Sequence, residues 1–312
     1  MPARDAVRDY ASAALRAADA RHRVPTPIED VQVAAHLTAA AIDQYIEAPP
    51  PSLARKFKRL TAKIRGFLSS PDRVLWVDPD LRHTQRRFVL AHEIGHHVLP
   101  WQREAYAVDG QPQLTPDTKE LFEREANQFA SHLLFNIDDF TDRAAAGSLS
   151  LTTPIALSSD FDASLIASCR RFVEEHPASC ALLVLGQFPT RSLGKPAAKL
   201  LYGVQSASFE RQFGAVMRGL RLPQAWPSDF HDLASDCYLA VTRQGFPLST
   251  GIFHALNGVS FLYEVLASRP HPIVLISPRK KFQFPSRVPE VRFNSAAAES
   301  AGSGEQVGVT SG

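Results

Sequence analysis

Residues 91–101 have the sequence AHEIGHHVLPW, which contains the pattern HExxH. Apolar residues before and within it recur at intervals of three and four, which predicts a helix with Thr84 as its N-cap and Pro100 at its end. The inward face of this helix would consist of Phe88, Ala91, His92, Gly95, His96 and Leu99. We expect the first domain to be built around this helix.

Both histidines of the pattern lie on the inward face. Side chains at positions i and i+4 stand one above the other on a helix, so His92 and His96 can reach one metal ion. Glu93 is turned about 100° from His92, toward a water molecule beside the ion. The alternative is a pair of ordinary core histidines, but it leaves the carboxylate of Glu93 unpaired on an apolar segment, where burial is costly. The pattern therefore favours a metal site.

A third metal ligand is expected from another element, because zinc peptidases hold the metal with three protein ligands. Residues 114–134, LTPDTKELFEREANQFASHLL, predict a helix with Thr115 as N-cap and Pro116 as first residue. Its apolar face would contain Phe122, Ala126, Phe129, Ala130, Leu133 and Leu134. Glu123 adjoins this face, and Asn127, one turn later, is placed to hydrogen-bond a ligand histidine.

The spacing alone leaves two interpretations of Glu123. The spacing slightly favours the interpretation in which Glu123 belongs to a solvated face, together with Lys119, Glu120, Arg124 and Glu125. The other makes Glu123 the third ligand. In that case we expect alanine to replace the neighbours Glu120 and Glu125 without loss of metal.

The two segments together carry a resemblance. RRFVLAHEIGHH (86–97) followed by EREANQFASHLL (123–134) is similar to the ImmA/IrrE family of metallopeptidases, with its motifs F-x-x-AHE-x-GH and E-x-x-A-N-x-F-A-x-x-LL. KIRGFLSSPDRVLWVDPDLRHTQRRF (63–88) fits the β-hairpin that precedes the metal helix in that family. Members often continue the second motif with Met-Pro, whereas Phe135 and Asn136 follow here, which affects the helix exit only.

The resemblance implies a gluzincin-like zinc site with His/His/Glu ligands. His92, His96 and Glu123 would bind Zn²⁺, and Glu93 would be the general base. The implied function is a zinc-dependent endopeptidase that cleaves a helix-turn-helix transcriptional repressor and so switches on stress or mobile-element genes.

The alternative function is a non-catalytic or DNA-binding regulatory protein with a structural zinc site. Glu93 favours catalysis, because a structural site does not need a carboxylate beside an open coordination position. His97, Tyr106 and His132 are candidates for stabilising the oxyanion, and spacing does not choose among them.

The expected fold is α+β, with a zincin-like metallopeptidase domain. It would contain an N-terminal helix, a helix capped by Thr26 over residues 28–46, a basic helix, a hairpin, the HExxH helix, a loop over 101–114 and the Glu123 helix. The strand RVLWV (73–77) is a candidate edge for binding an extended substrate, or equally an inner strand.

The rest of the chain predicts further units. Residues 1–145 would form the peptidase domain, 146–186 a linker with a helix-turn-helix-like segment, 187–293 a sensor-like (GAF-like) α+β domain, and 294–312 a disordered tail. The helix-turn-helix and GAF-like interpretations come from the resemblance. DNA binding has weak support from Arg170 and Arg171 and from basic residues between 55 and 65.

Composition favours a cytoplasmic protein. The 312 residues carry a net charge of +2, which does not require a nucleic-acid partner. No apolar run approaches the roughly 20 residues of a membrane helix, so no membrane partner is expected, and the charged N-terminus is unlike a secretory signal. Cys169, Cys180 and Cys237 lack metal-ligand spacing, and we expect them to be reduced and structural.

Overall fold

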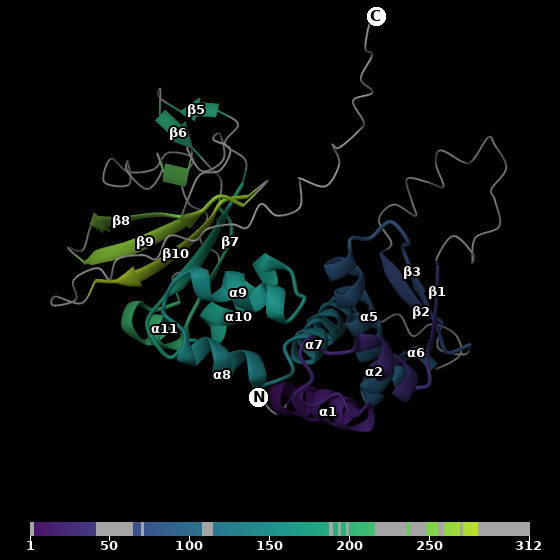
Figure 1. Ribbon diagram of the computed structural model, residues 1–312. Helices are drawn as coiled ribbons and strands as arrows, with labels where there is room; N and C mark the ends of the chain where they lie inside the picture. Colours follow the sequence, from purple (N-terminus) through teal and green to yellow (C-terminus); the bar gives the residue numbers. More distant parts are fainter. Residues whose placement is uncertain are drawn as a thin grey trace, which may run out of the picture.

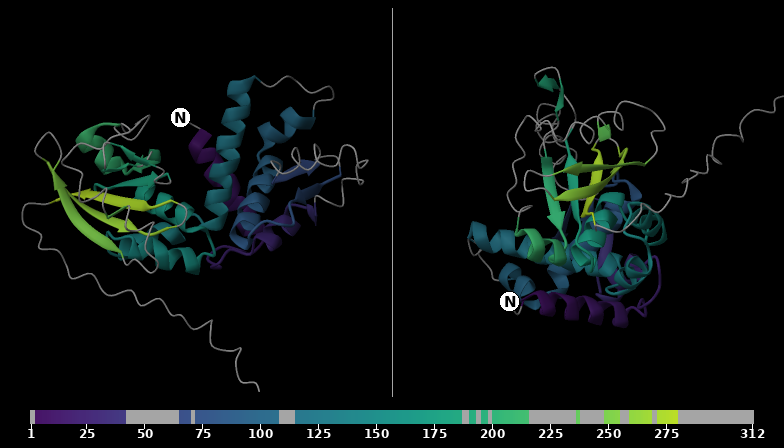
Figure 2. Two further views of the ribbon diagram at one scale, coloured as in Figure 1. Left: turned by 90° about the horizontal axis from the view of Figure 1, so that it is seen from above. Right: turned by 90° about the vertical axis from the view of Figure 1, so that its left-hand side faces the viewer.

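The computed structural model describes residues 3–41, 65–69, 72–107, 115–186, 190–192, 195–197, 200–215, 236–237, 248–254, 259–268 and 271–279. A three-stranded sheet lies near one end of the molecule and a five-stranded sheet near the other, with helices between them (Figures 1 and 2). The architecture is a mixture of helices and sheets, as the sequence predicts.

The N-terminal part contains five helices and three strands among the described residues. They are α1 (Ala3–Ala17), α2 (Ile28–Ala34), β1 (Thr38–Ala41), β2 (Gly66–Ser69), β3 (Val74–Val77), α5 (His83–Val98), α6 (Pro100–Ala107) and α7 (Pro116–Leu134). Helices α5 and α7 pack face to face, and fully buried side chains such as Ile94, Phe129 and Leu133 fill the space between them and their neighbours. This core fixes the relative position of the two helices on which the metal ligands are predicted.

The predicted hairpin is confirmed. Strand β2 pairs antiparallel with β3, with Gly66 opposite Val77, and β1 pairs parallel with the other side of β3, with Thr38 opposite Val74. The order β1-β3-β2 makes RVLWV an inner strand, so its assignment as a substrate-binding edge was wrong and the alternative is confirmed.

Two helix boundaries differ from the predictions. Helix α5 begins at His83 with Arg82 at its N-cap, so Thr84 lies inside the first turn. The predicted helix over 28–46 ends at Ala34, and the Ala-rich run Thr38–Ala41 forms strand β1 instead. Here pairing with β3 overrides the helical propensity of alanine.

The predicted loop over 101–114 was also partly wrong. Residues 101–107 belong to α6, and residues 108–114 lie outside the described part. Pro100 ends α5, but it also supplies the first residue of α6, a position where proline's missing N–H costs nothing.

The prediction for α7 is confirmed. The Thr115 hydroxyl accepts a hydrogen bond from the N–H of Thr118 at 3.3 Å, and Pro116 is the first helical residue. All six predicted apolar positions are buried: Phe122, Ala126, Phe129, Ala130, Leu133 and Leu134.

The C-terminal part consists of four helices and seven strands among the described residues. They are α8 (Asp139–Ala146), α9 (Thr152–Asp160), α10 (Leu165–Glu175), β4 (Ala181–Leu185), β5 (Thr190–Ser192), β6 (Lys195–Ala197), β7 (Leu200–Gln205), α11 (Ala207–Phe213), β8 (Ser249–His254), β9 (Ser260–Leu266) and β10 (Ile273–Pro278). Strands β7-β4-β10-β9-β8 form an antiparallel sheet, and β5 and β6 form a separate pair.

Alternate side chains of β4 pack into two different hydrophobic cores, one on each face of the sheet. Leu182 and Val184 pack with α8, α9 and α10 on one face of the sheet, whereas Leu183 packs with Phe209 of α11 on the other. This is the two-residue period of a strand that is covered on both faces.

The linker expected at the start of residues 146–186 is folded. It contains the end of α8 and the whole of α9, with Leu151, Pro154 and Leu157 buried. The helix-turn-helix-like and GAF-like interpretations stay predictions, as do the domain limits. The basic residues 55–64 and the tail 294–312 lie outside the described residues.

The first turn of α5 is tied to the turn between α9 and α10. The buried Arg87 donates through Nη2 to the carbonyl of Thr26 at 2.9 Å and through Nε to the carbonyl of Asp162 at 3.1 Å. The carboxylate of Asp162 also lies 3.3 Å from Arg87 Nε and 2.5 Å from His83 Nε2. These contacts join the helix with the HExxH pattern to the C-terminal helices.

Candidate metal centre

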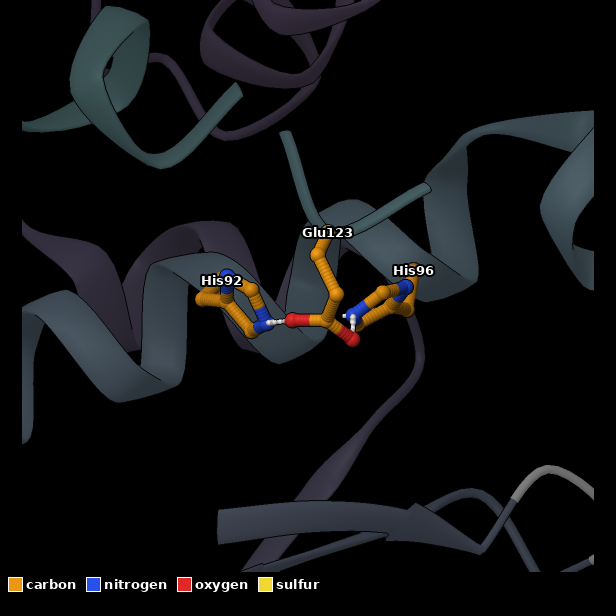
Figure 3. Close-up of side chains that lie close together, drawn as sticks. All are labelled: His92, His96 and Glu123. Carbon is orange, nitrogen blue, oxygen red and sulfur yellow. Dashed lines mark hydrogen bonds and ion pairs between the residues drawn. The ribbon is translucent and has the colours of Figure 1, made fainter. Parts of the chain in front are cut away.

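Two helices bring the predicted metal ligands together. His92 Nε2 and His96 Nε2 lie 3.1 Å apart on adjacent turns of α5. Glu123 reaches them from α7, with Oε2 3.3 Å from His92 Nε2 and Oε1 3.6 Å from His96 Nε2. Figure 3 shows both imidazole rings turned toward the carboxylate of Glu123.

This group has the composition and spacing of a metal site. One donor atom from each of His92, His96 and Glu123 lies within 4.8 Å of the other two. Two imidazoles and a carboxylate are a donor set that suits zinc with one position left open. The residues therefore fit the metal that the sequence predicts.

Each histidine has a second contact through Nδ1. His92 Nδ1 lies 3.1 Å from Oδ1 of Asn127, the residue predicted from its position one turn after Glu123. His96 Nδ1 lies 2.7 Å from Oε1 of Gln102 on α6. Gln102 was missed because its segment was predicted to be a loop, although Pro100 as a helix start could have revealed it.

The solvated-face interpretation of α7 holds for some of its acidic residues only. Glu120 is exposed, as is more than half of the Glu123 side chain, but Glu125 is buried. Its carboxylate accepts hydrogen bonds from Gln102 Nε2 at 2.8 Å and Trp101 Nε1 at 2.7 Å. Glu125 is therefore not equivalent to Glu120 as a neutral neighbour of the site.

Glu93 is buried beside the group without being one of its three members. Burial raises the pKa of Glu93 to about 7, with a smaller upward contribution from Glu123 and a downward one from His92. A Cβ atom added to Gly66 of β2 would lie 3.4 Å from Glu93 Oε1. The carboxylate is thus next to the backbone of that strand.

Charges within the group oppose the effect of burial. Burial lowers the pKa of His92, but the hydrogen bond to Glu123 and the charges of Glu93 and Glu123 raise it above its ordinary value. The pKa of His96 is lowered by burial and by the charge of His92. The hydrogen bond from His92 lowers the pKa of Glu123. Without an ion, His92 and Glu123 therefore each favour the charged form of the other.

Neither His97 nor His132, two of the three candidates for stabilising an oxyanion, belongs to the His92, His96 and Glu123 group. The pKa of His97 is lowered by burial and by Arg103 and Arg73, and its ring is hydrogen-bonded at the backbone of Ala35. His132 lies two and a half turns beyond Glu123 on α7, and the side chain of Tyr106 lies outside the described residues. That role stays unassigned.

The family of this domain follows from comparison with known proteins. Residues 53–173 match the IrrE N-terminal-like domain, peptidase family M78. The chain contains an ImmA/IrrE family domain. The match confirms the resemblance seen in the sequence and continues through α8, α9 and most of α10. An ImmA/IrrE domain with a His/His/Glu group fits a metallopeptidase.

The comparisons with solved structures and with curated proteins do not identify the function of the chain further. The structure of a Mycobacterium tuberculosis transcriptional regulator is similar at 14% sequence identity, with a TM-score of 0.48, covering 89% of this chain and 82% of that chain. A search of curated proteins finds no significant match. Within the described residues, no helix combines the length and apolar character required to cross a membrane.

The remaining predicted site residues have structural contacts. Arg171 is buried, donates to the carbonyl of Ile137 at 3.0 Å and pairs with Glu175 at 2.8 Å, and Arg170 pairs with Glu174. This arginine pair therefore gives little support to DNA binding. Cys169, Cys180 and Cys237 are free and buried, as predicted, and burial raises the pKa of each thiol.

Proposed function

We propose that this chain is a zinc-dependent endopeptidase in which His92, His96 and Glu123 hold Zn²⁺ and Glu93 is the general base. The observation that carries the proposal is the arrangement of the two carboxylates. Glu123 faces both histidines, whereas Glu93 is buried beside them and is not one of the three converging ligands. A purely structural site has no use for the second carboxylate.

When bound, zinc polarises the scissile carbonyl and makes a water molecule acidic enough to react near neutral pH. A carboxylate oxygen of Glu93 accepts the proton of the attacking water and delivers it to the nitrogen of the leaving amine. The histidines and Glu123 hold their positions throughout, and no covalent enzyme intermediate is required.

The proposed substrate is a helix-turn-helix transcriptional repressor, which the family resemblance supports. A repressor substrate would place the reaction in the cytoplasm. Strand β2, rather than β3, is the proposed docking strand for an extended segment of it. In the described sheet β2 occupies an outer position, and its Gly66 lies next to Glu93. A substrate strand paired with β2 would bring its backbone close to the general base.

The test compares the wild type with Glu93→Gln. The neighbouring reading frames are first searched for a small helix-turn-helix protein. If one is present, it is purified as the probe and incubated with each variant, with or without zinc. Glutamine keeps the size of the side chain and all three metal ligands but cannot accept the proton. We expect zinc binding to persist and cleavage to fall by a factor on the order of 10² to 10⁴.

A structural zinc site would give a different result. Glu93→Gln would then release the repressor's target genes in cells as well as the wild type, while removal of zinc would abolish that release. The same cleavage rate in both variants would also reject the proposed role of Glu93.

A further inference from the structure

Gln102 connects a predicted metal ligand to a buried carboxylate. Its side chain is fully buried and lies between His96 on α5 and Glu125 on α7. Gln102 Oε1 is 2.7 Å from His96 Nδ1, and its Nε2 is 2.8 Å from Glu125 Oε2 and 3.2 Å from the carbonyl oxygen of Phe122. All three contacts are within hydrogen-bonding distance.

The two contacts of Nε2 determine which way the amide is turned. An ionised carboxylate and a backbone carbonyl are acceptors only, so the NH₂ group of Gln102 must face Glu125 and Phe122. The amide oxygen must then face His96. Because that oxygen can only accept, His96 has to donate from Nδ1, which leaves Nε2 without a proton.

An unprotonated Nε2 is the form of histidine that can bind a metal. In this chain that nitrogen faces His92 and Glu123, at 3.1 Å from His92 Nε2. The chain of contacts from Glu125 through Gln102 therefore selects the tautomer of His96 that is suited to the site. It also holds the ring, because both partners are themselves buried.

Helix α6, which carries Gln102, also holds the carboxylate of Glu125 in place. Its Oε2 accepts a second hydrogen bond, from Trp101 Nε1 at 2.7 Å. Trp101 and Gln102 are neighbours near the start of α6, so one carboxylate on α7 fixes both side chains. This arrangement gives α6 a function in the site although it supplies no predicted metal ligand.

We propose that Gln102 and Glu125 are positioning residues that hold His96 in its Nδ1-protonated form for metal binding. The inference rests on the proposed function for the use of the metal, but the tautomer itself is a property of the metal-free protein. It differs from the expectation that Glu125 can be replaced by alanine without loss of metal.

The experiment measures zinc affinity by competition with a chromophoric chelator in folded, full-length variants. Gln102→Met removes the acceptor for His96 at nearly constant length, and we expect zinc affinity to fall about 10- to 100-fold. Glu125→Met should cause a loss of about tenfold, since the Nε2 group of Gln102 then keeps only its contact with the carbonyl of Phe122. Glu120→Met, on the exposed side of α7, is the matched control and should change the affinity less than twofold.

Two further variants separate positioning from general damage. Glu125→Gln keeps an oxygen that can accept from Trp101 and Gln102, so it should bind zinc nearly as well as the wild type. The double variant Gln102→Met/Glu125→Met should bind no more weakly than Gln102→Met alone, because Glu125 acts through Gln102. Fully additive losses would show that Glu125 acts by another route.

Nitrogen-15 NMR of the metal-free protein near pH 8 tests the tautomer directly. We expect His96 to be protonated at Nδ1 in the wild type and to become a mixture of tautomers in Gln102→Met. Unchanged zinc affinity or an unchanged tautomer in Gln102→Met would overturn the proposal. If the wild type shows the Nδ1 tautomer but binds no zinc, the positioning stands and the proposed function fails.

Discussion

Replacing Gly95 with alanine tests whether the spacing between α5 and α7 determines the geometry of the metal site. A Cβ atom at Gly95 would lie 3.1 Å from Phe129 Cδ1 and 3.3 Å from both Cβ and Cγ of Phe129. Phe129 is fully buried, so its ring has little freedom to move away. The two helices must therefore separate by a few tenths of an ångström.

Two opposing effects decide the stability of this variant. Alanine in a helix interior is favoured over glycine by about 0.8–1 kcal/mol, whereas overpacking of a core costs about 1–3 kcal/mol. We expect a net destabilisation of about 0–2 kcal/mol. The effect on metal binding should be clearer, because ligand distances in metal sites are held to about 0.2 Å. Since His92 and His96 are on α5 and Glu123 is on α7, zinc affinity should fall roughly tenfold.

Urea denaturation of the metal-free protein gives the free energy of unfolding, and a zinc titration gives the affinity. Adding Phe129→Leu should relieve the contact, so the double variant should recover part of the affinity lost in Gly95→Ala. If Gly95→Ala instead gained the full helix-propensity energy of about 1 kcal/mol and bound zinc like the wild type, the reasoning would be refuted.

Three other predictions concern metal content and stability. We expect metal analysis of the wild type to find about one zinc ion per chain. His92→Ala and His96→Ala should each lose this zinc, whereas the control Glu120→Ala should keep it. Equal zinc content in all three variants would reject the site assignment. Asp162→Ala removes the carboxylate beside the buried arginine of α5, and urea denaturation should show a loss of about 1–3 kcal/mol. Burial raises the pKa of Glu264 above its ordinary 4.5, so its protonated form stabilises the fold and this contribution is lost as pH rises through the folded-state pKa. The stability of the wild type relative to Glu264→Gln should therefore fall as pH rises above 4.5, and an opposite slope would contradict the assignment.

The helices of the site could be predicted because their signals are local. The HExxH pattern and the apolar spacing around it define most of α5, and Thr115 with Pro116 marks the start of α7. The third ligand could not be derived in this way. Spacing slightly favoured a solvated Glu123, and the interpretation as a ligand came from the family resemblance, because only tertiary packing turns that carboxylate toward the histidines.

The errors arose where one residue or segment has two compatible structures. Pro100 is a valid helix end and a valid helix start, and choosing only the first hid α6 and with it Gln102. The run Thr38–Ala41 has helical propensity, but its pairing with β3 decides its conformation. The order of the strands in the C-terminal sheet could not be predicted, because it depends on contacts between distant segments.

The three predicted ligands differ in how firmly the fold holds them. The side chains of His92 and His96 are 14% and 9% exposed, and each has a partner for Nδ1, whereas the Glu123 side chain is 57% exposed. The histidines are therefore placed before a metal ion arrives, and the carboxylate has to close on it. Entry of the ion from the side of Glu123 would require little movement of the core. The sequence favoured a solvated Glu123 and so argued against a ligand, but the observed exposure of Glu123 is compatible with a ligand at the open side of a metal site.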